Sequence, residues 1–388
     1  MGSLSPRSGP QGKLDHTGLL MLVTLKVVSM CQNYSDGLAL GDKAAGEHPR
    51  AFSTRPSLLQ ALGFCTLMHN NLVGPHMEYK AYLDFCEGTG AHAEAGAHGM
   101  RTRSKGAAGA GDAPDFKTRL ARSRAWYFLA TLARFVVFMG AYVHVGDLFP
   151  LRAMYGEGPG AAAYAAYPIW RKTAHGVGFI LCNTQTKYFA MWSLAELGMI
   201  AGGLSKWTGA DGTTRWDLFS NFDFLKLNTA SSARQMPSYW NVHTGHWLRY
   251  YSYERIFLDK GGKPTTASLF GTQIVSALWH GLAPGYLWFF VTTALFFEAG
   301  KVLYKYSVAA ENGLARGSLV ALNYVLPHVM IGQGGPPFMA LSWDRTASLV
   351  RGFGASGQLL CVAVIVLGAV FPPKKKRGAG SGSEKKGR

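Results

Sequence analysis

The stretch WYFLATLARFVVFMGAYVHV (Trp126–Val145) is apolar along nearly its whole length, with Arg134 as its one strongly basic residue. A helix needs about 20 mainly apolar residues to cross the hydrocarbon core of a bilayer. This stretch therefore predicts a transmembrane helix, and the pattern recurs along the chain. The other candidate segments are Gly18–Tyr34, Gly176–Gly203 (interrupted by NTQTK), Leu269–Gly281, Tyr286–Leu303, Leu319–Gly332 and Gly357–Phe371.

Shorter apolar segments, Ser57–Val73 and Phe338–Phe353, are typical of re-entrant, interfacial or kinked spans. Several longer segments contain polar residues, which favours helices packed in a bundle over helices that wholly face lipid. We therefore predict an all-α fold, a polytopic transmembrane helical bundle with about seven to nine membrane segments.

The composition agrees with a membrane protein. Hydrophobic residues make up 48% of the chain and charged residues only 16%, whereas an ordinary soluble domain has about 25% charged residues. Ten tryptophans, in a chain with 13% aromatic residues, suit the aromatic belts at membrane interfaces. A large soluble enzyme is the alternative, and the repeated apolar segments argue against it.

The net charge of +17 lies in loops and in a tail, and positive loops are preferentially cytosolic. We expect a polar N-terminal leader (1–14), a flexible cytosolic loop (88–115) and a basic cytosolic tail (372–388). If both the loop and the tail are cytosolic, an even number of crossings separates them. The final KKGR resembles a dilysine signal for endoplasmic-reticulum retrieval, and a plain basic tail is the alternative.

Sequence signals for a bound cofactor or metal are absent. The five cysteines have no CxxC spacing, which argues against a disulfide framework or a zinc site. His243 and His246 form an H-x-x-H pair without a convincing third ligand. No GxSxG elbow, P-loop or dinucleotide fingerprint occurs.

The stretch MPSYWNVHTGHWLRYYSYERI (Met236–Ile256) combines aromatic, basic and small polar residues. As a helix, it would place five residues on one face at three-to-four spacing. Its cations would suit phosphates at the headgroup level, and an interfacial anchoring helix is the alternative. The residues of that face are Trp240, Thr244, Trp247, Tyr251 and Glu254.

In SALWHGLAPGYLWFF (Ser276–Phe290), His280 stands within an otherwise apolar run. Ionisable groups at membrane depth are costly and tend to mark substrate or proton pathways. Desolvation would lower the pKa of His280 and keep the imidazole neutral, which is the form a general base needs. Gly281 and Pro284 indicate a helix break beside it. A satisfied packing histidine is the alternative.

Together these motifs resemble the membrane-bound O-acyltransferase family, in its lysophospholipid acyltransferase branch. The resemblance covers residues 15–371 in family order, although that family usually has further apolar helices where this chain has its leader. The two motifs around Asn241 and His280 are the most specific. The supporting motifs lie in Asp15–Gly37, Pro56–Phe85, Thr186–Glu196 and Arg215–Asn221.

The resemblance implies transfer of an acyl group from acyl-CoA to a lysophospholipid hydroxyl, inside a membrane-embedded reaction tunnel. It implies His280 as the catalytic histidine and Asn241 as the second active-site residue, with acyl-CoA as co-substrate and no bound cofactor. It also implies a multi-pass protein of the endoplasmic-reticulum membrane. The expected substrate-binding residues, for which a structural role is the alternative, are Trp240, Thr244, Lys187, Tyr188, Glu254, Arg255 and Trp279.

Two other functions stay open at this point. A related acyltransferase would use a sterol, a diacylglycerol or a protein as acceptor. A transporter would instead use His280 as a proton relay, which normally needs several intramembrane carboxylates. The predicted segments offer few of them, mainly Glu196 and Glu298.

Overall fold

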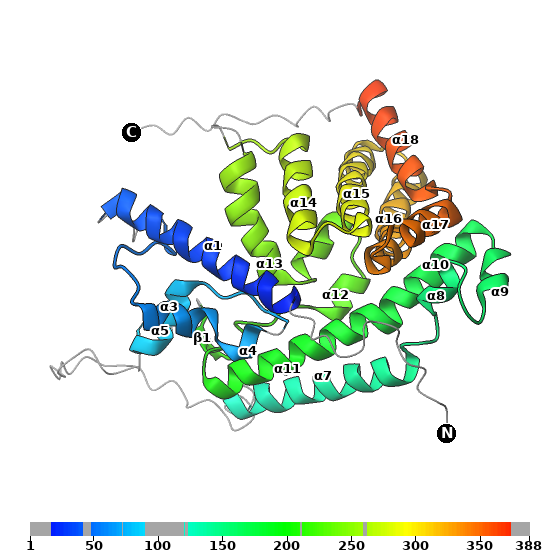
Figure 1. The fold of residues 1–388 in the computed structure, drawn as a ribbon. Coiled ribbons are helices and arrows are strands. Elements are labelled where there is room, and N and C mark those ends of the chain that lie inside the picture. Colours follow the sequence, from blue (N-terminus) through cyan, green and yellow to red (C-terminus); the bar gives the residue numbers. More distant parts are fainter. Residues whose placement is uncertain are drawn as a thin grey trace, which may run out of the picture. The chain divides into compact units, whose positions relative to one another are not determined.

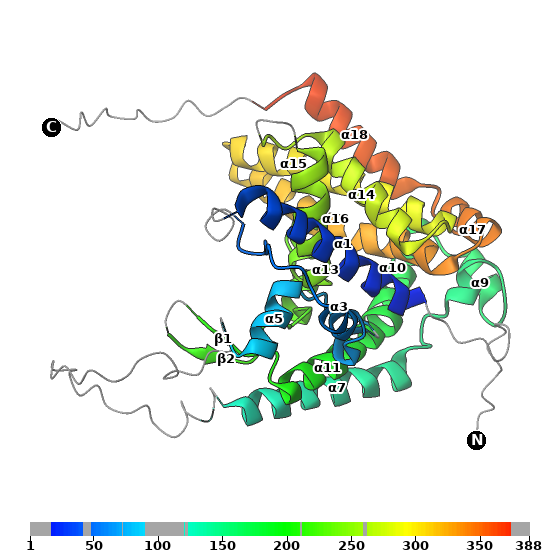
Figure 2. The ribbon, with the colours of Figure 1, turned by 60° about the vertical axis from the view of Figure 1, so that its left-hand side comes forward.

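The computed structural model describes residues 17–41, 48–71, 73–89, 120, 123–209, 212–258 and 262–373. Within these residues the chain is mostly helical, and its strands form one antiparallel hairpin, β1 (Trp207–Thr208) with β2 (Thr214–Arg215) (Figure 2). The predicted helical class is confirmed, whereas the small hairpin was not predicted. The predicted leader lies outside the described residues, as do the predicted loop and tail apart from residues 88–89 and 372–373.

The chain divides into two compact units, Met1–Val136 with Met191–Ser220, and Val137–Ala190 with Asn221–Arg388. Two of the three boundaries between them fall inside helices, α7 (Arg124–Val145) and α11 (Thr186–Gly202). The two candidate catalytic residues, Asn241 and His280, belong to the second unit.

The first unit is organised around a buried lysine. Lys26 is 1% exposed, and its Nζ donates to the carbonyl of Phe64 at 2.9 Å, to Asn70 Oδ1 at 2.8 Å and to Asn71 Oδ1 at 2.5 Å. A buried ammonium group is tolerated only when such acceptors replace its water. These bonds tie together three of this unit's helices. The helices wholly inside it are α1 (Thr17–Leu40), α3 (Leu58–Cys65), α4 (Met68–Asn71) and α5 (Tyr79–Glu87).

The second unit contains the longest helices. Helix α15 (Pro284–Ala309) packs against α14 (Thr266–His280) and α16 (Gly313–Ala340), and the three lie side by side in Figures 1 and 2. The remaining elements are α8 (Leu151–Met154), α9 (Ala161–Ala165), α10 (Ile169–Phe179), the π-helix η3 (Ile180–Gln185), α12 (Phe224–Asn228), the 3₁₀ helix η4 (Ala233–Ser238), α13 (Val242–Trp247), the π-helix η5 (Leu248–Phe257), α17 (Trp343–Phe353) and α18 (Ser356–Val370).

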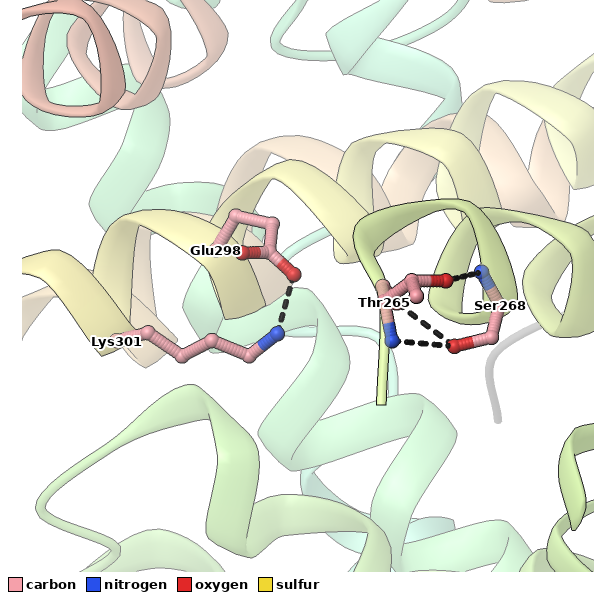
Figure 3. Close-up of polar contacts among 4 residues, drawn as sticks. All are labelled: Thr265, Ser268, Glu298 and Lys301. Atoms are coloured by element: carbon pink, nitrogen blue, oxygen red, sulfur yellow. Dashed lines mark hydrogen bonds and ion pairs between the residues drawn. The ribbon is translucent and has the colours of Figure 1, made fainter. Parts of the chain in front are cut away.

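Local sequence signals explain where these helices begin. At α14 the Thr265 hydroxyl accepts from the Ser268 backbone, and the Ser268 hydroxyl accepts from the Thr265 backbone, forming a capping box (Figure 3). Helix α15 begins with Pro284, whose missing N–H costs nothing at this position. Further along α15, Glu298 pairs with Lys301 one turn later (Figure 3).

Glycines allow the helices of the second unit to approach closely. A Cβ on Gly176 of α10 would lie 1.9 Å from the carbonyl oxygen of Gly332 on α16. A Cβ on Gly285 of α15 would lie 1.9 Å from the carbonyl oxygen of Pro337 on α16. Only glycine fits at such backbone contacts. The placement of α16 against α10 and α15 therefore depends on these two residues.

Fewer helices qualify as membrane spans than the sequence predicted. By length and hydropathy, the described residues contain three such helices, α7, α15 and α16, or four if α17 and α18 form one bent span. The angle at the break between α17 and α18 is 63°. The prediction of a membrane protein is supported, whereas the predicted number of seven to nine segments and the internal tunnel stay predictions.

Candidate functional site

The stretch predicted as one helix, Met236–Ile256, is not a single α-helix. It starts in the 3₁₀ helix η4, which contains Pro237, and passes through Trp240, which forms a bridge with Phe222. Only Val242–Trp247 is α-helical, and Leu248–Phe257 is a π-helix. The predicted common face is therefore kept in part: Thr244, Trp247 and Tyr251 are buried. Trp240 lies before the left-handed residue Asn241 and outside the helix, and Glu254 is exposed in the π-helix.

Asn241 is held by one neighbouring asparagine. Its backbone is left-handed, with φ 49° and ψ 51°, immediately before α13, a conformation that asparagine tolerates better than most residues. Asn221, which is 1% exposed, donates from Nδ2 to Asn241 Oδ1 at 3.1 Å. Asn221 also accepts from the backbone N–H of Val242 and of His243, each at 3.1 Å. Three hydrogen bonds to Asn221 thus fix this turn.

Aromatic rings pack behind the same turn. Phe189 stacks on Phe222 with centroids 4.2 Å apart and planes 9° apart. Trp240 contacts Phe189 at 5.5 Å and Tyr188 at 5.7 Å, both edge to face. Such pairs add to the stability gained by burial alone. The start of α11 therefore supports the backbone that positions Asn241.

His280 is the last residue of α14. Gly281 follows with φ 121°, a conformation that favours glycine, and α15 begins three residues later. The predicted helix break is confirmed. Two rings from other helices flank the imidazole: Phe290 of α15 is stacked at 5.2 Å and 29°, and Phe338 of α16 meets it edge-on at 5.0 Å and 79°.

Two more rings complete the surroundings of His280. Trp279 lies 4.7 Å from the imidazole and Tyr286 lies 5.5 Å from it, centroid to centroid. Among the described residues, none forms a hydrogen bond with either imidazole nitrogen. Apolar surroundings disfavour the imidazolium ion, because it would lose hydration without gaining a counter-charge. A partly exposed, neutral imidazole suits a proton acceptor.

Aromatic side chains lie beside each of the two candidate catalytic residues. Trp240, next to Asn241, contacts Tyr188, and Tyr286 contacts His280. Each candidate residue or its neighbour thus has an aromatic partner from another helix, Tyr188 of α11 for Trp240 and Tyr286 of α15 for His280.

The other predicted substrate-binding residues have mixed surroundings. Thr244 is only 5% exposed, and the Lys187 ammonium lies 5.4 Å from the centroid of the Tyr188 ring. Glu254 pairs with Arg249 at 2.7 Å. This pair spans five residues within the π-helix η5. Both Glu254 and Arg255 are exposed.

Comparison with known proteins identifies the class of enzyme. A family model described as MBOAT, membrane-bound O-acyltransferase family, matches residues 163–311. Lysophospholipid acyltransferases 1 and 2 of Arabidopsis thaliana are 30% and 31% identical to the chain, over 95% of it and over 75% and 74% of their own lengths. The chain belongs to the membrane-bound O-acyltransferase family. Lysophospholipid acyltransferase of Saccharomyces cerevisiae is 30% identical over 75% of this chain and 46% of its own length.

Membership of this family makes the protein an O-acyltransferase enzyme of the membrane. The matched range contains both Asn241 and His280. The transporter alternative loses its support, because the two carboxylates it would use are paired. Glu196 accepts from Arg134 at 2.7 Å, and Glu298 pairs with Lys301.

The described residues contain no group of three or more side chains that could hold a metal ion. The rings of His243 and His246 are 6.1 Å apart and 70° from parallel. A two-histidine pair supplies only half of the usual zinc coordination.

Three residues near the site were missed as functional candidates in the sequence: Asn221, Phe290 and Phe338. Asn221 ends the motif RWDLFSN, but nothing in that motif indicates Asn241 as its partner. Phe290 ends the quoted stretch around His280, within an apolar run that is typical of a spanning helix. Phe338 begins a segment predicted to be a re-entrant, interfacial or kinked span, and only the packing of α16 brings it to His280.

Proposed function

We propose that the protein transfers a fatty acyl group from acyl-CoA to the free hydroxyl of a lysophospholipid. The observation that supports this most strongly is His280, which stands at a helix break among aromatic rings without a hydrogen-bond partner among the described residues. The acceptor class comes from the relatives, which are named lysophospholipid acyltransferases.

In the proposed reaction, a neutral His280 accepts the proton of the lysophospholipid hydroxyl. The hydroxyl oxygen attacks the thioester carbonyl, and a tetrahedral oxyanion forms. The intermediate collapses to the ester and releases the thiolate of coenzyme A, which takes the proton back from the imidazolium. A hydroxyl is a poor nucleophile at neutral pH until a base removes its proton. General-base assistance contributes about 10²–10⁴ in rate.

The side-chain amide of Asn241 is suited to donate a hydrogen bond to the oxyanion. Its Oδ1 accepts from Asn221, and among the described residues no group accepts a hydrogen bond from its Nδ2. An amide donor held in place before the reaction stabilises negative charge in the transition state without reorganisation. Asn221 would thus orient the Asn241 amide so that its N–H groups face the substrate.

We further propose a multi-pass location in the endoplasmic-reticulum membrane, with seven to nine segments around an internal tunnel. The long apolar helices α7, α15 and α16 support the membrane location. A site shielded from water would also limit hydrolysis of the thioester. The aromatic residues Trp240, Tyr188 and Trp279 would line the substrate path, together with Thr244 and Lys187.

The test is acyl transfer in membranes that contain the full chain, with labelled oleoyl-CoA and a panel of lysophospholipids. We expect diacyl phospholipid from the wild type, and a loss of about 10²–10⁴ in turnover for His280→Gln at equal protein level. For Asn241→Ala we expect a loss of about 10²–10³. Phe371→Leu, just after the end of α18, serves as the control. Wild-type turnover by His280→Gln would show that His280 takes no part in the reaction. Product formed only with a sterol or diacylglycerol acceptor would show that the acceptor is not a lysophospholipid.

A further inference from the structure

No hydrogen bond among the described residues holds the imidazole of His280 in its orientation. A functional histidine is ordinarily held by a hydrogen bond from its second ring nitrogen, which selects the tautomer and the ring orientation. Among the described residues no such partner contacts either nitrogen of His280. Its side chain is nevertheless partly buried. Packing must therefore provide the restraint that hydrogen bonding does not.

Phe290 and Phe338 restrain the imidazole from two directions. Phe290 is nearly parallel to it, at 29° and 5.2 Å, so it covers one face of the ring. Phe338 is nearly perpendicular, at 79° and 5.0 Å. A stacked neighbour and an edge-on neighbour together oppose rotation of the imidazole about the bond to Cβ, because rotation would drive its edge into Phe290.

The position of Phe338 is itself fixed by a backbone contact. A Cβ on Gly285 would lie 1.9 Å from the Pro337 carbonyl oxygen and 3.4 Å from Phe338 Cα. The first turn of α15 and the last turns of α16 are thus in direct contact beside His280. His280 immediately precedes the break before α15, and Phe338 immediately follows Pro337 in α16. The contact between Gly285 and Pro337 therefore holds the ring of Phe338 next to the imidazole.

We propose that Phe290 and Phe338 are positioning residues for acyl transfer, which hold the His280 imidazole in the orientation that brings a ring nitrogen to the acceptor hydroxyl. The proposal rests on the proposed function of His280. Small displacements of a catalytic group are costly, since about 1 Å of misplacement can reduce a rate about 100-fold. The two rings thereby provide the restraint that no hydrogen-bond partner among the described residues provides.

Kinetics of the purified full chain in lipid nanodiscs test the catalytic part of the proposal. We expect Phe290→Leu and Phe338→Leu to lower kcat about tenfold or more while KM for both substrates changes little, because binding is retained and orientation is lost. Phe338→Tyr keeps the ring and should restore most of kcat. Phe289→Leu is the matched control, because Phe289 contacts Phe290 and Phe338, each at 5.2 Å, and not His280.

Nuclear magnetic resonance of protein labelled at histidine Cε1 tests, without relying on turnover, whether the two rings lie against the imidazole as the positioning role requires. His280→Gln assigns the His280 signal by its disappearance. We expect this signal to move in Phe290→Leu and Phe338→Leu, since the ring current of the lost phenyl group no longer acts on the imidazole, and to stay in place in Phe289→Leu.

The outcomes separate the two proposals. If the signal does not move, or if kcat of Phe290→Leu and Phe338→Leu equals that of Phe289→Leu, the positioning role is overturned even though the wild type is active. If the wild type transfers no acyl group, the proposed function is overturned even though the signal moves. If Phe338→Leu does not fold, Phe290→Leu decides by the same two measurements.

Discussion

At the scale of single residues, Asn221 decides which end of the Asn241 amide is available. Asn221 donates to Asn241 Oδ1 at 3.1 Å, so the opposite end, Nδ2, is left to donate to a substrate. The same residue accepts from the His243 backbone through its own Oδ1. One buried amide therefore sets both the turn and the orientation of a candidate catalytic group.

This arrangement predicts a specific effect for Asn221→Asp. The carboxylate can still accept from the His243 backbone, but it cannot donate to Asn241 Oδ1. The Asn241 amide then turns over and donates Nδ2 to the carboxylate, so the oxyanion loses its donor. We expect kcat to fall about 10²-fold with little change in KM, measured as initial rates of acyl transfer.

The control for this variant is Asn183→Asp. Asn183 donates from Nδ2 to the Gly146 carbonyl at 3.1 Å, away from the turn. It therefore loses one amide donor of the same kind, at a cost in stability of about 1 kcal/mol. An equal loss of kcat in both variants would mean that Asn221 acts on stability alone.

At the scale of elements, the close contact between α10 and α16 depends on glycine. The Cβ of Gly176→Ala would lie 1.9 Å from the Gly332 carbonyl oxygen, so the two helices must separate. Gly140 of α7 has open space around its Cα, with nothing within 4 Å of the position that a Cβ would take. Replacing glycine by alanine should therefore destabilise the protein at position 176 of α10 but not at position 140 of α7.

We expect Gly176→Ala to lower the midpoint of thermal unfolding by several degrees, because overpacking costs about 1–3 kcal/mol. Gly140→Ala should leave the midpoint unchanged or raise it, because alanine stabilises a helix interior by about 0.5–1 kcal/mol relative to glycine. Thermal unfolding of the two variants in the same detergent measures both. A fall of equal size in the two would show that the α10–α16 contact is not as close as described.

Two π-helices, η3 and η5, lie close in the sequence to residues of the proposed site. The π-helices η3 and η5 precede Lys187 and follow Asn241, and π-helical turns in proteins are frequent at functional sites. The polar stretch NTQTK within the apolar segment Gly176–Gly203 falls on the π-helix η3 and the start of α11. The π-helix η5 was missed, because its hydrogen-bond pattern leaves no distinct spacing of apolar residues.

At the scale of the whole molecule, the number of membrane segments is the main difference from expectation. Helices α14 and α18 have 15 residues each, which at 1.5 Å per residue span only about 22 Å. A hydrocarbon core is about 30 Å thick. Apolar composition alone does not distinguish a spanning helix from other helices, because a helix buried between others can be as apolar as one that faces lipid.

The sequence nevertheless predicts a testable topology. Positive loops favour the cytosolic side, so the segment 88–115 and the tail 372–388 should lie on the same face of the membrane. We expect epitope tags inserted in each to be cleaved by protease in intact microsomes, since both face outward there. Cleavage of one tag only, with the other released after detergent is added, would place an odd number of crossings between them.

The sequence by itself determined the helical class, the family and the two residues expected to act, Asn241 and His280. It also determined the helix end at His280, because glycine and proline act on the backbone within a turn of their own position. Only the tertiary structure decided that Asn221 orients Asn241, that Glu254 pairs with Arg249, and that Phe290 and Phe338 enclose the imidazole. The spacing of residues in the sequence indicates only which side chains are neighbours along one regular helix. It cannot report on a helix interrupted at Pro237, nor on rings from α15 and α16 that meet His280 only because glycine lets those helices touch.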